Sequence, residues 1–466
     1  MPRPVRVLLL AAILPHCLPA GAATPAPCRI EIVEEGAGWP VPLIELRTTH
    51  NVRFVSDNAG VIAFDLPELM GRETWFDVSG HGYEVPEDGF GYRGIRLTPE
   101  PGGTLRVEVR RTIVARRLGR LTGGGLFAES QQTGRDWEWP ESGVLGCDSV
   151  QTAMHRGRLY WLWGDTTLAR YPLGIFDSLG ATTPRRALTS FEPPLRLKFE
   201  IFQDGAGRPR GITRMPGGGP TWATGMTSLP NREGIPRLVC AYMKIRPPLE
   251  EYEWGLAVWN EQTEEFDRLK VIWSKSKETP VRPVVPAGHP VRWRDDAGNE
   301  WVLFGHPFPH LRCPATYEAW SNPWTWEPLT PPTAFEAADG TGKVIPHSGV
   351  HSGGIAWSAF RQRWAAVFLQ LGGEPSALGE LWYAEAKSPF GPWGRAVKVL
   401  SHENYTFYNP KLHPDLTPAE SPILLFEGTY TRQFANRPEP TPRHDYNQML
   451  YRLDLDDPAL APAQRE

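Results

Sequence analysis

A loose repeat covers most of the chain and constrains its fold more than any other feature. From about residue 114 onward, a short polar or histidine-bearing segment is followed by aromatic-rich segments that alternate in period two and by a tryptophan-containing hairpin. Such alternation between turn residues is typical of β-strands. The five units begin with GCDSVQTAM, WATGMTSLP, AGHPVRWRD, HSGGIAWSA and YNPKLHPDL. Repeated β-units of this kind predict a five-bladed β-propeller over residues 114–466. Residues 184–215 are hard to place, which keeps six blades open as an alternative.

The segment before the repeat has a different rhythm and predicts a small β-sandwich over residues 28–112. Its strands alternate in period two between turn residues. The order Asp57-Asn58-Ala59-Gly60, Ala63-Phe64 and Gly80-His81-Gly82-Tyr83 resembles the carboxypeptidase regulatory-like, or transthyretin-like, sandwich. The resemblance implies a spacer or binding accessory without chemistry of its own. We therefore expect an all-β protein with an N-terminal β-sandwich and a propeller, in which His81 is structural.

The N-terminal residues 1–22 have the pattern of a cleaved signal peptide, with two arginines, a short apolar core and an Ala-Gly-Ala end. We expect a secreted or periplasmic protein. Because no later run of about 18 apolar residues occurs, we expect no membrane span. The net charge of −4 and the absence of a basic block exclude nucleic acid as an expected partner.

Four cysteines follow the predicted signal: Cys28, Cys147, Cys240 and Cys313. An oxidising compartment would permit disulfides, and four cysteines allow three pairings between which sequence cannot choose. Buried free thiols are the equal alternative. Neither Cys-x-x-Cys nor His-x-x-x-His spacing occurs, so we expect no zinc site.

Three segments of the repeat resemble known propeller families. LWYAEAKSPFGPW (residues 381–393) is similar to blade-edge strands of glycoside hydrolase family 43-like propellers and their family 117 relatives. WLWGDT (residues 161–166) and YNPKLHP (residues 408–414) resemble the exported propellers of domain of unknown function 4185. The resemblance implies a five-bladed fold and a carbohydrate-active function.

The candidate site follows from propeller geometry. The innermost strands of all blades begin at one end of the central channel, here called the mouth, so polar residues at those positions converge there. Chance polarity at exposed strand ends is the alternative. The residues at these positions are Asp148, Thr224, His289, His351, Tyr408, Asn409 and His413.

The family resemblance implies that Asp148 is the general base of a glycoside hydrolase. A second group must donate a proton across the scissile bond. The glutamate that family 43 enzymes carry in the third blade has no counterpart here, where WVLFGHPFPH offers His306 and His310. The substitutes are Glu427, Glu380, or a histidine, because imidazole titrates near neutral pH and family 117 propellers use a histidine acid. The candidate catalytic residues are Asp148, Glu427, His289 and His351.

Further residues are assigned to substrate binding. Asp165 could either cap a turn or line the pocket, since aspartate readily bonds backbone amides two residues on. We expect no cofactor, with a channel cation near His289, His351 and His413 left open. The candidate substrate-binding residues are Asp165, Arg170, Trp222, His306, Tyr408, Asn409, His413 and Arg432.

The leading interpretation is therefore an exported glycoside hydrolase that acts on a polysaccharide by acid–base hydrolysis. A non-catalytic carbohydrate-binding or surface propeller is the alternative, favoured by the missing third-blade glutamate. A polysaccharide lyase is a third interpretation, for which Tyr408, His413 and Arg432 supply the residue types but no motif.

Overall fold

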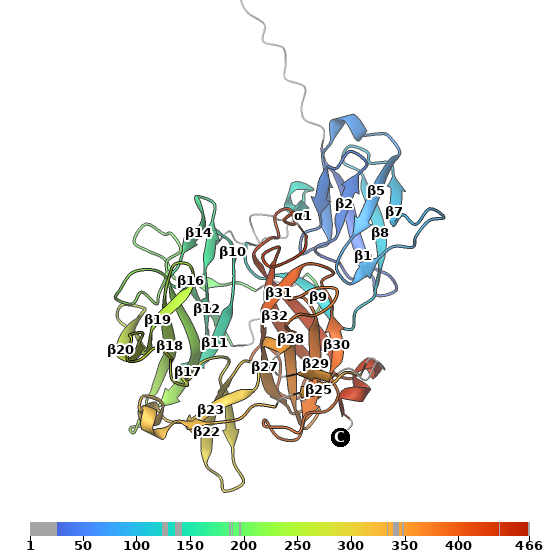
Figure 1. Cartoon of the computed structure of the whole chain (residues 1–466). Helices are drawn as coiled ribbons and strands as arrows, with labels where there is room; N and C mark the ends of the chain where they lie inside the picture. The colour runs from blue at the N-terminus through green and yellow to red at the C-terminus, as the bar shows by residue number, and fades with distance from the viewer. Residues whose placement is uncertain are drawn as a thin grey trace, which may run out of the picture.

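Strands dominate the computed structural model of the chain (Figure 1). It describes residues 26–123, 129–135, 142–185, 188, 190–194, 197–332, 334–338, 344–346, 349–437 and 439–464. The predicted signal segment, residues 1–22, lies outside these ranges, so export stays a prediction.

Two four-stranded sheets form the N-terminal part of the chain, and they are called the N-terminal sheets below. One has the order β4-β1-β8-β6 and the other β3-β2-β5-β7. Their inward side chains, such as Ile30, Phe64 and Phe76, form one buried cluster. The strands are β1 (Cys28–Glu34), β2 (Glu45–Thr48), β3 (Arg53–Val55), β4 (Val61–Phe64), β5 (Thr74–Ser79), β6 (Tyr83–Glu84), β7 (Gly94–Leu97) and β8 (Thr104–Arg111).

Five further four-stranded antiparallel sheets follow in the described residues, and they are numbered here as sheets 1 to 5. Sheet 1 contains β11 (Val150–His155), β12 (Arg158–Trp163), β15 (Gly180–Pro184) and β16 (Glu200–Ile201). Sheet 2 contains β17 (Thr221–Pro230), β18 (Pro236–Arg246), β19 (Glu250–Asn260) and β20 (Glu265–Ser274). Residues 200–201, within the stretch 184–215 that sequence could not place, thus complete sheet 1.

Sheets 3 to 5 repeat the pattern. Sheet 3 contains β21 (Val291–Arg294), β22 (Glu300–Gly305), β23 (Pro309–Pro314) and β24 (Glu327–Pro328), and sheet 4 contains β27 (Val350–Ser358), β28 (Arg363–Gln370), β29 (Leu381–Ala386) and β30 (Val397–Leu400). Sheet 5 contains β31 (Thr406–Leu412), β32 (Ile423–Thr431), β33 (Asn447–Asp454) and β9 (Arg116–Arg120). Because β9 comes from the other end of the repeat, its pairing with β33 covers a strand edge and ties the two ends together.

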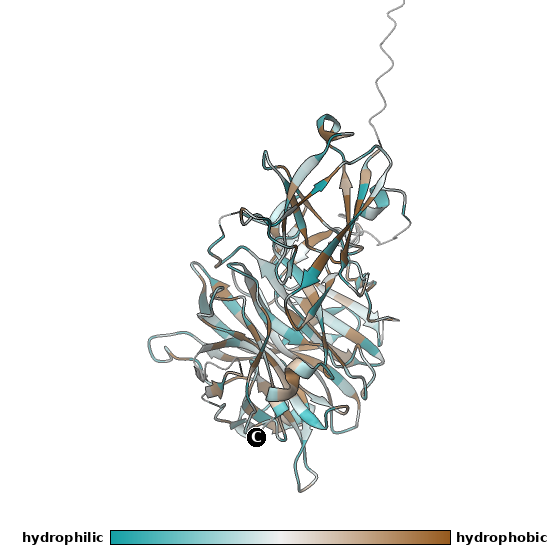
Figure 2. Ribbon diagram, turned by 90° about the vertical axis from the view of Figure 1, so that its right-hand side faces the viewer, coloured by the Kyte–Doolittle hydropathy of each residue, from teal (hydrophilic) through white to brown (hydrophobic). Residues whose placement is uncertain are grey.

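The hydrophobic clusters join each of these sheets to the next. Leu162 of sheet 1 and Tyr242 of sheet 2 belong to one such cluster. Three more clusters join sheet 2 to sheet 3, sheet 3 to sheet 4, and sheet 4 to sheet 5. A final cluster joins Trp161 of sheet 1 to Leu425 of sheet 5. The five sheets therefore pack in a closed ring. Figure 2 shows the alternation of hydrophobic and hydrophilic residues along these strands.

Smaller elements complete the described part of the chain. A three-stranded sheet of β10 (Val144–Cys147), β13 (Thr166–Leu168) and β14 (Tyr171–Ile175) flanks sheet 1, and β25 (Ala334–Glu336) pairs with β26 (Val344–Pro346). The helices are short: α1 (Glu129–Gln132), α2 (Tyr317–Trp320) and 3₁₀ turns at Pro67–Leu69, Pro323–Thr325 and Pro458–Gln464. No helix in the described ranges is long and apolar enough to cross a membrane. The cysteines at positions 28, 147, 240 and 313 are buried and free.

The N-terminal sheets rest on sheet 5, above which they lie in Figure 1. Arg117 of β9 is fully buried in this contact. Its guanidinium donates hydrogen bonds to the carbonyl oxygens of Pro42 (2.9 Å), Leu43 (3.0 Å) and His81, and to the hydroxyl of Tyr451 (3.1 Å). One side chain thereby satisfies buried acceptors on both sides of the interface.

Replacement of Arg117 by Ala should lower the free energy of unfolding by about 2–4 kcal/mol, because buried carbonyl groups lose their donors. Urea unfolding of the Arg117→Ala variant measures this loss. Arg110→Ala is the control, since Arg110 pairs with Glu84 on the exposed surface. A loss no larger than that of the control would contradict this role for Arg117.

Candidate functional site

The site lies where the inner strands of the ring begin. β11 contacts both β17 and β31, and β27 contacts β31. Side chains at the starts of these strands bridge neighbouring sheets: Asp148 reaches Tyr408 of sheet 5, and Asp165 reaches Trp222 of sheet 2. The convergence that sequence predicted for Asp148 and Tyr408 is thus present as a direct contact.

Asp148 precedes β11 and is held by two tyrosines. The Tyr408 hydroxyl donates to Asp148 Oδ2 at 2.7 Å, and the Tyr446 hydroxyl also donates to this carboxylate. Burial raises the pKa of Asp148, while both tyrosine hydrogen bonds oppose that rise. A Cβ atom at position 164 would lie 2.1 Å from Asp148 Oδ1. Gly164 is therefore required for the Asp148 carboxylate to occupy its place.

Asp165 follows Gly164 and forms the second carboxyl group of the site. Its Oδ1 accepts a 3.1 Å hydrogen bond from the indole Nε1 of Trp222. Burial, followed by the negative charge of Asp148, raises the pKa of Asp165 to about 7. The first of two neighbouring carboxyls to ionise suppresses ionisation of the other. We assign the first ionisation to Asp148, so that Asp165 holds a proton near neutral pH. Of the two roles predicted for Asp165, capping a turn and lining the pocket, the Trp222 contact favours the second, which stays a prediction.

Backbone strain is concentrated around Asp148. Three non-glycine residues beside it have left-handed backbone conformations: Ser149 (φ 44°), Asn409 (φ 50°) and Tyr446 (φ 57°). Asn409 Nδ2 donates to Ser149 Oγ at 2.6 Å, and the backbone amide of Ser149 donates to Thr429 Oγ1 at 3.1 Å. Such conformations cost free energy and cluster where function requires a fixed geometry.

A second polar cluster lies deeper among the inner strands. Gln151 Nε2 lies 3.4 Å from His289 Nδ1. His413 Nε2 lies 2.7 Å from Glu427 Oε1, but the geometry of this contact does not meet the angles of a hydrogen bond. Burial, together with the charge of Lys411, lowers the pKa of His289. The side chains of His413 and Glu427 are 1 % and 0 % exposed. This cluster therefore lies out of reach of a polysaccharide at the mouth.

Lys411 belongs to the same deep cluster. Its ammonium donates to the carbonyl of Leu412 at 2.9 Å. Burial lowers the pKa of Lys411 to about 8, opposed by Asp415 and Glu427. The ring of His413 packs at 5.1 Å from that of Trp161. We therefore assign His289, His413 and Glu427, three of the predicted site residues, to the support of the inner strands.

The remaining predicted histidines lie on sheets 3 and 4. His306 follows β22 and is exposed to solvent, with its ring 5.4 Å from that of His289. His351, in β27, contacts Ser352 Oγ at 3.0 Å through Nδ1. His310 Nε2 contacts the carbonyl of Val285 at 3.1 Å. In the described part of the chain, no group of three or more His, Cys, Asp or Glu side chains is arranged to hold a metal ion.

Four other candidates have structural or peripheral positions. Thr224 Oγ1 accepts from the backbone amide of Gly288, linking sheet 2 to the segment before β21. Glu380 is fully buried and contacts Lys398 of β30 and Ser401, which follows β30. Arg170 is exposed in the turn between β13 and β14. Arg432 is exposed after β32, and its backbone amide donates to Asp445 Oδ1 at 2.6 Å.

Sequence reasoning missed Tyr446, which sits one residue before β33 and not at the start of an inner strand. It also missed the exposed Phe434, whose ring lies 6.2 Å from that of Tyr408. Both residues belong to the segment between β32 and β33. No motif marks this segment, and only its return to the mouth reveals its role.

No protein-family model and no curated protein matches the sequence of this chain. Among solved structures, it is similar to an exo-β-1,3-galactanase from Phanerochaete chrysosporium with galactose, at 9 % identity and a TM-score of 0.40 over 67 % of this chain and 61 % of that one. An exo-1,5-α-L-arabinanase from a bovine ruminal metagenomic library is similar at 11 % identity and a TM-score of 0.38, over 67 % and 95 % of the two chains. The arabinanase of Bacillus subtilis is similar at 10 % identity and a TM-score of 0.35, over 66 % and 96 %. The chain spans less than two thirds of the galactanase, and these likenesses are too distant to transfer an activity.

Proposed function

We propose that this protein is a carbohydrate-active hydrolase whose reaction is carried by Asp148 and Asp165. The observation that carries the proposal is a pair of neighbouring carboxyl groups in different environments. Two tyrosine hydroxyls hold Asp148, whereas burial and the Asp148 charge raise the pKa of Asp165 to about 7. Carboxyl pairs whose pKa values are pushed apart in this way perform general acid and general base roles.

In the proposed reaction, Asp165 donates its proton to the glycosidic oxygen as the bond to the anomeric carbon breaks. Asp148 accepts a proton from the water molecule that adds to that carbon. The products are two sugar fragments. One carries the proton on the former glycosidic oxygen, and the other carries the hydroxyl of the water on its anomeric carbon. Asp165 thus takes the acid role for which sequence offered Glu427, His289 and His351.

The surroundings of the pair suit a sugar ring. Trp222 lies against Asp165, and Phe434, 67 % exposed, stands next to Tyr408. Aromatic faces of this kind provide contact area for the apolar faces of sugars, while their polar edges can hydrogen-bond. This combination favours a carbohydrate substrate over a purely ionic one.

The proposal includes a fold and a domain division. We propose that sheets 1 to 5, residues 114–466, form a five-bladed β-propeller, supported by the five hydrophobic clusters that close the ring. We likewise propose that residues 28–112 form a β-sandwich, supported by the shared core of the N-terminal sheets. Release by a signal peptide, followed by action on an extracellular polysaccharide, completes the proposal.

A reducing-sugar release screen over plant and algal polysaccharides tests the function. Wild-type protein should release sugar from at least one polysaccharide, and the double variant Asp148→Asn/Asp165→Asn should release none. Binding without release by the wild type would favour the non-catalytic alternative. Release of a product that absorbs in the ultraviolet would indicate a lyase, although Tyr408 is bonded to Asp148 and His413 is buried.

A further inference from the structure

The segment between β32 and β33 connects the candidate site to the N-terminal sheets. It comprises residues 432–437 and 439–446 and is called the mouth loop below. At one end it carries Phe434, and at the other Tyr446, whose hydroxyl donates to Asp148. The position of a hydrogen-bond donor on the candidate base therefore depends on this loop.

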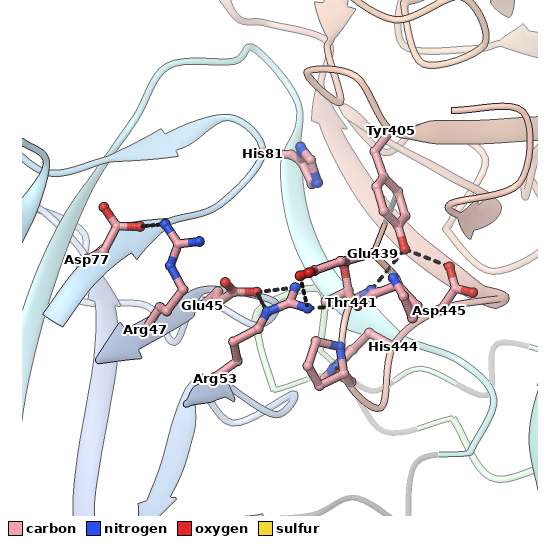
Figure 3. A network of polar contacts seen from close by, with 12 residues as sticks. Glu45, Arg47, Arg53, Asp77, His81, Tyr405, Glu439, Thr441, His444 and Asp445 are labelled. Atoms are coloured by element: carbon pink, nitrogen blue, oxygen red, sulfur yellow. Dashed lines mark hydrogen bonds and ion pairs between the residues drawn. The ribbon is translucent and has the colours of Figure 1, made fainter. Parts of the chain in front are cut away.

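Arg53 of β3 forms the first attachment of the mouth loop (Figure 3). Its Nη1 donates to the carbonyl of Pro440 at 3.1 Å and lies 3.4 Å from Glu439 Oε2. Glu45 orients the guanidinium through contacts of 2.9 and 2.6 Å. Because Glu439 is 74 % exposed, its ion pair contributes little, and the Pro440 carbonyl is the main anchor.

A second attachment passes through Glu129 of α1. Its Oε2 accepts a 2.7 Å hydrogen bond from the backbone amide of Ala63 in β4, and its Oε1 pairs with Arg443 of the mouth loop. Glu129 is buried whereas the Arg443 side chain is 46 % exposed, so water screens the pair in part, and burial raises the pKa of Glu129 to about 7. Arg443 itself has a left-handed backbone (φ 62°), which such contacts must maintain.

A third attachment comes from Arg120 of β9 in sheet 5, whose backbone is held by the turn between β3 and β4. Asn58 exchanges two hydrogen bonds with the backbone of Arg120, at 2.8 and 2.9 Å. The Arg120 guanidinium in turn donates to the carbonyl oxygens of Arg443 and Leu145. Opposite this contact, Tyr405 bonds Asp445 and Thr441, as Figure 3 shows. The loop is thus clamped between sheet 5 and the N-terminal sheets.

We infer that the N-terminal sheets are a positioning part of the active site: through Arg53, Glu129 and Asn58 they hold the mouth loop so that Tyr446 donates to Asp148. The catalytic consequence rests on the proposed function, whereas the clamping of the loop does not. This assigns a role in catalysis to a segment whose sequence pattern indicates a spacer.

The effect on chemistry follows from the groups that face Asp148, which are Tyr408, Tyr446 and Asp165. Both tyrosine hydrogen bonds lower the pKa of Asp148. A mouth loop that is less well held would present Tyr446 for less of the time. The pKa of Asp148 would then rise, and the acid limb of the pH–rate profile would move to higher pH.

Arg53 and Arg47 form a matched pair for the test. They are direct neighbours across β2 and β3, and each pairs with a carboxylate of the same sheet, but Arg47 bonds Asp77 while Arg53 also reaches the mouth loop (Figure 3). Hydrogen–deuterium exchange of peptides from residues 432–446 should be about tenfold faster in Arg53→Ala, because one net hydrogen bond is lost. Arg47→Ala should leave it unchanged.

Glu129→Gln gives an independent second variant, which should also accelerate exchange in the loop while the N-terminal sheets keep theirs. With a polysaccharide found in the screen, both variants should lower kcat about three- to tenfold and change KM less. Both should also move the acid limb of the pH–rate profile to higher pH. Arg53→Lys should restore part of the loss. Unchanged exchange in Arg53→Ala and Glu129→Gln overturns the inference whatever the screen returns, and faster exchange with an unmoved acid limb overturns the catalytic part.

Discussion

Asp148→Asn should lower the rate of polysaccharide hydrolysis by roughly 10²–10⁴-fold, the usual contribution of a general base. The amide keeps the size of the carboxylate and can still accept hydrogen bonds from Tyr408 and Tyr446. It cannot accept a proton from water. The loss should therefore appear in kcat with little change in KM, because the interaction removed acts in the transition state. Initial-rate measurements on a polysaccharide from the screen give both constants.

A control variant separates this effect from a general loss of carboxylate charge. Asp267 is exposed on β20, where it accepts a 2.8 Å hydrogen bond from Asn260. Asp267→Asn changes the net charge by the same amount and should keep full activity. Asp148→Asn protein that hydrolyses at the wild-type rate, with an unchanged unfolding midpoint, would remove Asp148 from the mechanism.

The sheets were predictable because the pattern that identifies a strand lies within a few consecutive residues. A β-strand that buries one face alternates apolar and polar residues, and this alternation identifies segments such as TWFDVS and TLRVEVRR. The five polar segments likewise coincide with β11, β17, β21, β27 and β31 or their starts. The short β16 was not predictable, since two paired residues leave no period to detect.

The site was predictable only where it coincides with an inner-strand start. Asp148 and Tyr408 occupy such starts, and their side chains meet. Tyr446 reaches Asp148 from the loop before β33, the third strand of sheet 5, and no spacing along the chain reveals this contact. The sequence also does not reveal how deeply a side chain is buried. Glu427 and His289 carry suitable groups, but both are buried, with 0 % and 4 % exposure.

Asp165→Asn should remove most of the rate of the reaction. The activity that remains should no longer fall as the pH rises through neutral. A general acid works only while it is protonated, and the pKa of Asp165 is about 7. Wild-type activity should therefore fall as the pH rises through about 7, and the asparagine variant should lack this limb. Loss of the acid should lower kcat by roughly 10²–10⁴-fold on substrates with poor leaving groups. An activated aryl glycoside, whose leaving group needs no proton, should be affected much less.

The same substitution should stabilise the fold at alkaline pH, which distinguishes a catalytic acid from a structural one. Since burial and Asp148 raise the folded-state pKa of Asp165, the folded chain keeps a proton that the unfolded chain has lost between its ordinary pKa of 3.8 and about 7. The free energy of unfolding of the wild type therefore falls as the pH rises through that window. Asparagine can accept the Trp222 hydrogen bond without ionising.

At pH 8 the Asp165→Asn variant should accordingly be more stable than the wild type, by on the order of 2–4 kcal/mol, and at pH 4 the two should be nearly equal. Urea unfolding at both pH values measures the difference, with Asp267→Asn as the variant that should show none. A catalytic carboxyl held near Asp148 at a cost in stability gives this combination of lost activity and gained stability. An asparagine variant that is inactive and also less stable at pH 8 would instead mark Asp165 as a structural contact of Trp222.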